Sequence, residues 1–147
     1  MATHPLVQQG TLNRVRCSVV VPNFTNLNIT SPYMGKSFAR LAFEGDFAGL
    51  IGTATGAVSS TEPYVFGNIT VGLLRTQALS GQWLQQVQQF SVIGPVTIYS
   101  DSAAFPPIPL DNCVVNQIDP GAFDGTDPVV RLVLRGVFYA NSDLWNV

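Results

Sequence analysis

Apolar residues recur at every second position within residues 38–76, and this period constrains the fold more than any other feature of the sequence. It is clearest at residues 64–74, where the alternating apolar positions are Val65, Ile69, Val71 and Leu73. A repeat of two is that of a β-strand with one buried face. The opposite positions carry small or weakly polar residues. Such a face is neither a charged solvent surface nor a full core, and it favours packing against other copies or lining a channel.

Similar alternation predicts further strands on both sides of this region. The expected strands lie at residues 13–21, 38–44, 47–58, 64–75, 95–100, 113–119 and 129–139. Loops are expected where Pro, Gly, Asn and Asp gather, at residues 23–33, 59–63, 105–111 and 119–128. Three prolines at residues 105–111 argue against a central strand there.

Residues 77–90 change the period, because their apolar residues recur at spacings of three and four, as on one face of an α-helix. These residues are Leu79, Trp83, Leu84, Val87 and Phe90. Ser80 is the expected N-cap, since its hydroxyl can accept from the free amides of the first turn. The opposite face carries glutamines where Glu and Lys are usual. An uncharged face of this kind fits contact with another protein, and an ordinary polar solvent face fits it equally well.

About seven strands and one helix predict a mainly β fold, an antiparallel sandwich or barrel with the helix at one side or end. At 147 residues we expect one domain, residues 1–147. Charged residues make up only 11% of the chain, against about 25% in ordinary globular domains. With a net charge of −2, little repulsion keeps copies apart. Oligomerisation explains this composition, and a neutral monomer is the alternative.

Cys17 and Cys113 lie far apart in apolar strand patterns, and we expect two buried thiols rather than a disulfide. Residues 1–16 lack the basic start and apolar run of a signal peptide. No segment reaches the ~18 consecutive apolar residues of a membrane helix. The sequence therefore predicts a protein that is made in the cytoplasm and does not insert into a membrane.

Little in the sequence points to catalysis. His4 is the single histidine, so we expect no Cys–His pair, and no Cys or His cluster has the spacing of a zinc site. Glu44 and Asp46 are the nearest pair of carboxylates for acid–base chemistry, but a turn edge or a channel wall explains them better. The aspartates of residues 119–128 lack the spacing of a calcium loop and are typical of turns. We therefore expect no enzyme, no metal and no cofactor.

In its order of elements the chain resembles the tail tube proteins of contractile-tailed bacteriophages, which are similar in fold to the tube proteins of type VI secretion systems. The resemblance spans nearly the whole chain. It rests on the small-residue strands at 37–76, the helix at 77–90, the strand at 95–100, and the loop and strand at 119–137. No catalytic motif forms part of it.

The resemblance implies a virion protein, assembled in the cytoplasm of the bacterial host, that forms hexameric rings stacked into a hollow tube. Strands of neighbouring subunits would join in an inner β-barrel, which removes exposed sheet edges. The implied partners are other copies of the chain, the contractile sheath protein, and the tape measure and baseplate proteins. DNA would pass through the channel during genome ejection without specific binding.

A channel that does not retain DNA needs a polar or acidic wall. The candidate wall residues are Glu44, Asp46, Thr53, Thr55, Asn68 and Thr70. The candidate subunit contacts are of three kinds. They are the outer glutamines of the helix, two basic residues that suit such a wall poorly, and two arginines expected to pair with carboxylates of a neighbouring subunit: Gln82, Gln85, Gln86 and Gln89; Lys36 and Arg40; Arg131 and Arg135. The basic residues of the chain are too dispersed for a DNA-binding patch.

Other functions remain open at this point. A tube-initiating baseplate ring or a tail terminator would belong to the same structural class. A small-ligand-binding β-barrel of the lipocalin kind, with aromatic residues lining an internal cavity, would belong to another class. An enzyme that uses Glu44 or Asp46 is the most distant alternative.

Overall fold

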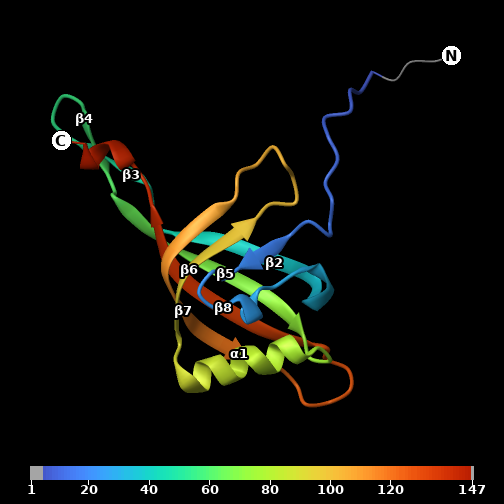
Figure 1. Ribbon diagram of the computed structural model, residues 1–147. Helices are drawn as coiled ribbons and strands as arrows, with labels where there is room; N and C mark the ends of the chain where they lie inside the picture. The colour runs from blue at the N-terminus through green and yellow to red at the C-terminus, as the bar shows by residue number, and fades with distance from the viewer. Residues whose placement is uncertain (1–4, 147) are drawn as a thin grey trace.

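The computed structural model describes residues 5–146, whose eight strands form two antiparallel sheets (Figure 1). The strands are β1 (Ser18–Val20), β2 (Met34–Glu44), β3 (Ala48–Gly52), β4 (Ala57–Thr61), β5 (Tyr64–Leu74), β6 (Val92–Tyr99), β7 (Ile108–Asp119) and β8 (Val129–Tyr139). The helices are α1 (Ala78–Gln89) and three short 3₁₀ turns, η1 (Thr25–Leu27), η2 (Ser31–Tyr33) and η3 (Ser142–Trp145).

Six strands form a sheet in the order β1-β6-β7-β8-β5-β2, and this sheet is curled into a half-barrel (Figure 1). Strands β2, β6 and β7 contain register shifts, and each of them has a residue with positive φ at one shift: Phe38 in β2, Gly94 in β6 and Asn112 in β7. Extra residues in one strand bend it and increase its twist, so these bulges account for the curl. The fold is mainly β and antiparallel with one α-helix, as the sequence predicted.

The inner face of this sheet holds the hydrophobic core. Burial alternates along the whole of β5 and along most of β8, which confirms the period of two in both strands. Gly67 lies opposite Gly136, and Leu110 packs over this pair. A Cβ atom at Gly136 would overlap Cys113 Sγ and lie 3.0 Å from Leu110 Cβ, so only glycine fits there without a shift of β7.

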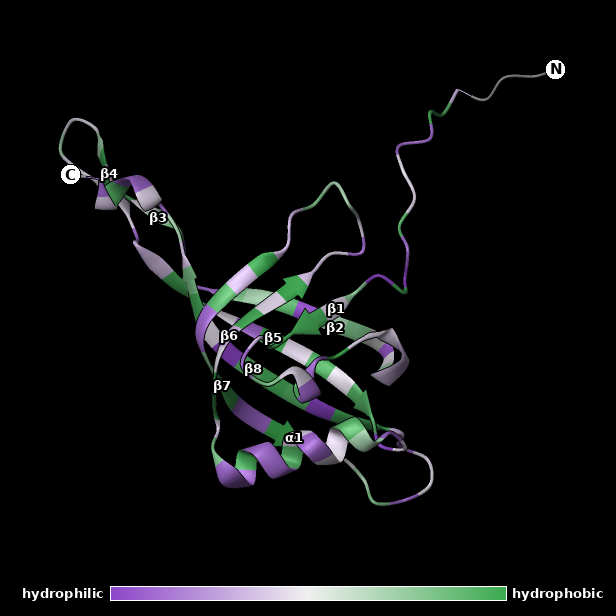
Figure 2. Ribbon diagram, in the orientation of Figure 1, coloured by the Kyte–Doolittle hydropathy of each residue, from purple (hydrophilic) through white to green (hydrophobic). Residues whose placement is uncertain are grey.

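Helix α1 crosses one end of the half-barrel (Figure 1), and apolar and polar residues alternate along it in Figure 2. Its buried line runs through Leu79, Trp83 and Val87. Leu84 and Phe90 were predicted on this face, but they lie off the line and are 49% and 63% exposed. The predicted Ser80 cap is wrong, because Gln77 is the N-cap and the Ser80 hydroxyl donates to its carbonyl at 2.9 Å. Among residues 5–146, no helix is long and apolar enough to cross a membrane.

Residues 47–61 differ most from the sequence prediction. In place of one strand ending near residue 58 and a turn at 59–63, the structure has a β3–β4 hairpin with its turn at 53–56. The Thr53 amide donates to the Gly56 carbonyl at 2.8 Å and closes this turn. Residues 59–61 stay extended because they pair with residues 48–50 across the hairpin.

Several strand boundaries also differ. Strands β2 and β6 begin at Met34 and Val92 rather than at residues 38 and 95, and the differences are largest in β1 and β7. Strand β1 is three residues long rather than residues 13–21, because it pairs with β6 over only three positions and Val15 is 70% exposed. Strand β7 begins at Ile108, inside the predicted proline-rich loop. Pro109 is tolerated because the pairing of β7 with β8 starts only at Asp111, which leaves one side of Pro109 without a neighbouring strand.

Candidate assembly interface

The outer face of β2, β5 and β8 brings together three of the residues singled out from the sequence. Asn68 Nδ2 donates to Glu44 Oε1 at 2.6 Å, and Arg135 Nη2 donates to Glu44 Oε2 at 2.7 Å. The Arg135 guanidinium also lies over the Phe66 ring, 4.5 Å from its centroid. The side chains of Arg135 and Glu44 are 38% and 48% exposed. A pair this accessible to water contributes about 0.2–1 kcal/mol, so its effect is to fix the positions of the groups.

The strand register places candidates of both kinds on this one face. Asn68 lies opposite Arg135, Thr70 lies opposite Arg40, and Gly72 lies opposite Arg131. Predicted wall residues and predicted subunit contacts therefore alternate across the same surface. Arg135, expected to meet a carboxylate of a neighbouring subunit, pairs with a carboxylate of its own chain.

The remaining candidates lie in four other places. Asp46 is in the connection from β2 to β3, Thr53 and Thr55 are in the hairpin turn, and Lys36 is in the bulged part of β2. The glutamine candidates lie along α1: Gln82, Gln85 and Gln89 are exposed and Gln86 is half-buried. The structure brings neither the wall set nor the contact set together as a single cluster, and both assignments stay predictions.

The β3–β4 hairpin projects from the half-barrel (Figure 1), and every residue of both strands is exposed. It contains no charged residue between positions 47 and 61. Leu50, Ile51 and Val58 are 79%, 58% and 55% exposed, and Ile51 pairs with Val58 across the strands. An isolated two-stranded hairpin is marginally stable in water. Sequence reasoning missed this element, although an uncharged run at residues 47–61 with three glycines was a signal for it.

The base of the hairpin is tied to the end of β8. Asn141 Nδ2 donates to the Phe47 carbonyl at 3.0 Å and to the Glu62 carbonyl at 2.7 Å, so one side chain holds both strands of the hairpin base. Phe47 also packs edge-on against Phe43, at 5.3 Å between ring centroids, and against Phe138 at 6.1 Å. These contacts fix the direction in which the hairpin points. Asn141 was not among the residues selected from the sequence.

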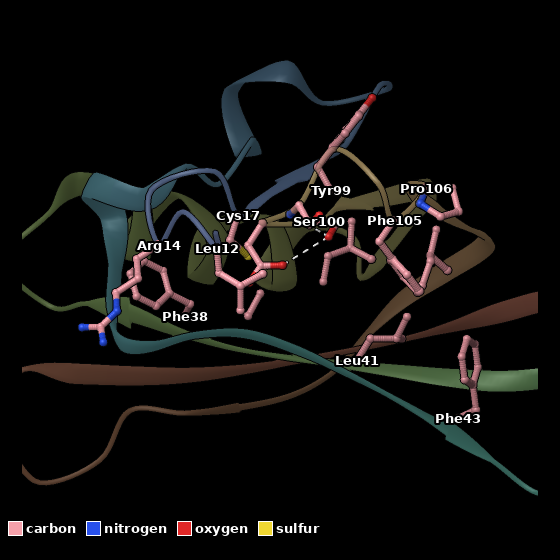
Figure 3. A pocket seen from close by; sticks show the side chains of 15 residues that line it. Leu12, Arg14, Cys17, Phe38, Leu41, Phe43, Tyr99, Ser100, Phe105 and Pro106 are labelled. Atoms are coloured by element: carbon pink, nitrogen blue, oxygen red, sulfur yellow. Dashed lines mark hydrogen bonds between the residues drawn. The ribbon is translucent and has the colours of Figure 1, made fainter. Parts of the chain in front are cut away.

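A groove of about 740 Å³ opens where the half-barrel fails to close (Figure 3). Strand β2 forms one wall, with Phe38, Leu41 and Phe43. The end of β6 and the loop that follows it form the other wall, with Phe105 among the lining residues, and Cys17 also borders the groove. Its lining is mainly apolar, with Arg14 and Asp101 among the polar exceptions.

The aspartate-rich loop at residues 120–128 is ordered around an arginine. The Arg75 guanidinium donates to the carbonyls of Pro120 and Ala122 and lies 5.3 Å from the centroid of the exposed Phe123 ring. Hydrogen bonds from the Thr126 side chain and amide lower the pKa of Asp124, and hydrogen bonds from the amides of Val129 and Ala122 lower the pKa of Asp127. A cationic side chain thus binds the carbonyl oxygens that a calcium ion would need.

The described residues offer little to catalysis. Within residues 5–146, no three His, Cys, Asp or Glu side chains come close enough to hold a metal ion. Both cysteines are free thiols; Cys113 is buried as predicted, whereas Cys17 is only half-buried. Burial raises the pKa of the Cys113 thiol to about 12, which leaves it a poor nucleophile. His4 lies outside the described residues.

Similarity to known proteins lies in the structure rather than in the sequence. No model of a known protein family matches the sequence, and no curated protein matches it. Among solved structures, the chain is similar to the tube-terminating cap of the anti-feeding prophage, determined by cryo-electron microscopy. That match has a TM-score of 0.49 and 14% sequence identity, and covers 93% of this chain and 97% of the cap chain.

Proposed function

We propose that this protein is the structural subunit of a phage tail tube, a chain that assembles into stacked hexameric rings enclosing a channel for DNA inside a contractile sheath. The observation that carries the proposal is the uncharged β3–β4 hairpin, which exposes Leu50, Ile51 and Val58. Fully burying one such side chain is worth about 1.5–3 kcal/mol. Scaled by the exposed fractions, covering all three contributes about 3–6 kcal/mol per hairpin, which favours association of copies.

Two further features support self-assembly. The half-barrel leaves β2 as an edge strand, and an exposed edge is a template for pairing with another chain. The chain also carries little charge to oppose contact between copies. In this proposal the partners are other copies of the chain, the sheath, and the tape measure and baseplate proteins. The location is the virion tail.

Negative-stain micrographs and light scattering of the purified protein test the proposal. We expect rings or tubes, and their loss when Ile51 and Val58 are both changed to Thr, because threonine keeps the strand propensity while it removes apolar surface. The Ser60→Thr variant alters the same hairpin face without removing apolar surface and should assemble normally. A wild-type protein that stays monomeric at high concentration and across salt conditions would refute the proposal.

The length of the product separates a tube subunit from a ring that starts or terminates a tube. Tubes of many rings indicate the first role, and single rings that do not stack indicate the second. A monomeric small-ligand-binding β-barrel is a second candidate, favoured by the groove of about 740 Å³, a volume within the usual range of ligand sites. Retention of a hydrophobic dye by a stable monomer would support that candidate.

A further inference from the structure

The groove at the open side of the half-barrel has two features that a further segment of chain would satisfy: an apolar lining and an unpaired strand edge. It is lined by apolar side chains that stay partly accessible to water: Leu41 and Phe43 are half-buried, and Phe105 is 57% exposed. It is also bordered by β2, which pairs with β5 on one side and has no strand on the other. What would complete the groove must therefore supply apolar side chains and an extended backbone that can pair with a sheet edge.

The N-terminal segment of the chain has both properties. Residues 5–12 carry no charge, form no helix or strand, and make no backbone hydrogen bond to the rest of the described chain. Leu6, Val7 and Leu12 are 86%, 80% and 70% exposed, values typical of apolar side chains that lack a partner. A free strand edge and an unpaired, uncharged apolar segment thus occur in one molecule.

The direction in which this segment leaves the sheet shows whether it can enter its own groove or the groove of another copy. Leu12 and Arg14 already line the groove (Figure 3). From there the chain runs away from the sheet toward the N-terminus (Figure 1). To fill its own groove the segment would have to reverse at once, whereas it can enter the groove of a neighbouring copy without reversal. We propose that residues 5–12 of one copy lie in the groove of a second copy, added as a strand along the free edge of β2.

The pairing is limited to part of β2. The bulge between Met34 and Ala39 interrupts the regular register, and regular pairing with β5 runs from Ala39 to Glu44. The added strand therefore lies beside residues 39–44, next to the groove residues Leu41 and Phe43. Successive side chains of a strand point to opposite faces, so only one of Leu6 and Val7 faces into the groove.

The half-buried thiol of Cys17 lines the groove and provides a built-in probe (Figure 3). Two variants of the full-length protein, Leu6→Cys and Val7→Cys, are oxidised mildly with diamide and separated on a non-reducing gel. We expect covalent dimers linked to Cys17, with a strong yield at one of the two positions and a weak yield at the other. Removing Cys17 with Cys17→Ser should abolish the link, and Gln88→Cys, on the outer side of α1, should give no link to Cys17.

A second measurement follows a hydrophobic dye. The double variant Leu6→Asn, Val7→Asn should vacate the groove and bind several-fold more dye than the wild type. The double variant Gln8→Asn, Gln9→Asn is the matched control and should bind as little dye as the wild type. Equal dye binding by the wild type and the apolar-to-polar variant would show that the groove is open in both, which overturns the exchange of segments.

The inference rests on the proposed self-assembly, and the outcomes separate the two. Disulfides formed within one chain would show that the segment folds back on its own groove, and they would overturn the exchange. Normal rings or tubes without any cross-link to Cys17 would overturn the exchange and leave the proposed function standing. A strict monomer without cross-links would overturn both.

Discussion

Replacing Asn141 with glycine should loosen the β3–β4 hairpin without disturbing the half-barrel. Asn141 has φ and ψ near 51°, a left-handed conformation that glycine adopts without strain. The substitution therefore removes the two hydrogen bonds to the Phe47 and Glu62 carbonyls and leaves the backbone unstrained. The contact of Phe47 with Phe43 and Phe138 remains.

The magnitude follows from the exposure of these bonds. A hydrogen bond in a folded protein contributes about 0.5–1.5 kcal/mol net. Both carbonyls at the hairpin base are accessible to water, so we take the lower end for each, or about 1 kcal/mol in all. A loss of this size raises the open population of the hairpin about fivefold. The Asn141→Ala variant should open it further, because a left-handed alanine costs another ~1–2 kcal/mol.

Native-state hydrogen exchange measures this opening residue by residue, because hairpins can open without global unfolding. Asn112 is the matched control: it also has φ of 51° and makes no side-chain hydrogen bond among the described residues. The Asn112→Gly variant should leave exchange in β3 and β4 unchanged. Asn112→Ala should lower the free energy of unfolding only by the cost of a left-handed alanine.

Equal exchange in the hairpin of Asn141→Gly and Asn112→Gly would show that the Asn141 side chain does not hold the hairpin. Equal acceleration by Asn141→Gly in β5 and β8 and in β3 and β4 would show that the side chain supports the whole sheet instead. If the hairpin drives assembly, Asn141→Gly should in addition raise the concentration at which rings form, because a mobile hairpin loses more entropy on binding.

Three further predictions concern other sites. Glu44→Gln should lower the free energy of unfolding by about 0.2–1 kcal/mol at low salt, and by less at high salt, as measured by urea denaturation. Only about 10⁻⁴ of the Cys113 thiol is ionised at pH 8, because its pKa is about 12. A maleimide reagent should therefore leave Cys113 unmodified in the native protein and modify it after unfolding. Peptide mass spectrometry measures both outcomes. The pKa values of Asp124 and Asp127 are lowered in the folded loop, so their stabilisation is present above about pH 4 and is lost as the pH falls through the folded values. Carboxyl carbon NMR titration should give both values below the usual aspartate pKa of about 3.9.

The sequence predicted best those parts of the fold where pattern and tertiary contact agree. Strand β8 spans residues 129–139 as expected, because its alternation coincides with pairing on both sides. The helix was also found, but its cap and two of its apolar residues were not. Local periodicity cannot show that α1 buries a single line of side chains, since that depends on how much sheet lies beneath it.

The candidate site was harder to predict because its parts are distant in sequence. Glu44 and Arg135 meet only because β2 and β8 flank β5, and Asn141 reaches residues 47 and 62 only because the hairpin folds back to the end of β8. No spacing rule connects these positions. The hairpin itself was missed because its three glycines are spread over residues 49–56, and only its own cross-strand pairing shows where the reversal falls.

The charges on the outer face of the half-barrel help to decide which surface would form the wall of a channel. Arg40, Arg131 and Arg135 lie on this face, and Glu44 is already engaged by Arg135. A wall that carries three arginines would attract DNA rather than let it pass. The hairpin carries no charge from residue 47 to residue 61, and Thr53 and Thr55 lie at its tip. Under the proposed function, charge therefore favours the hairpin tip as a surface facing DNA, the apolar strands of the hairpin as contacts between copies, and the outer face of the sheet as a contact with other proteins.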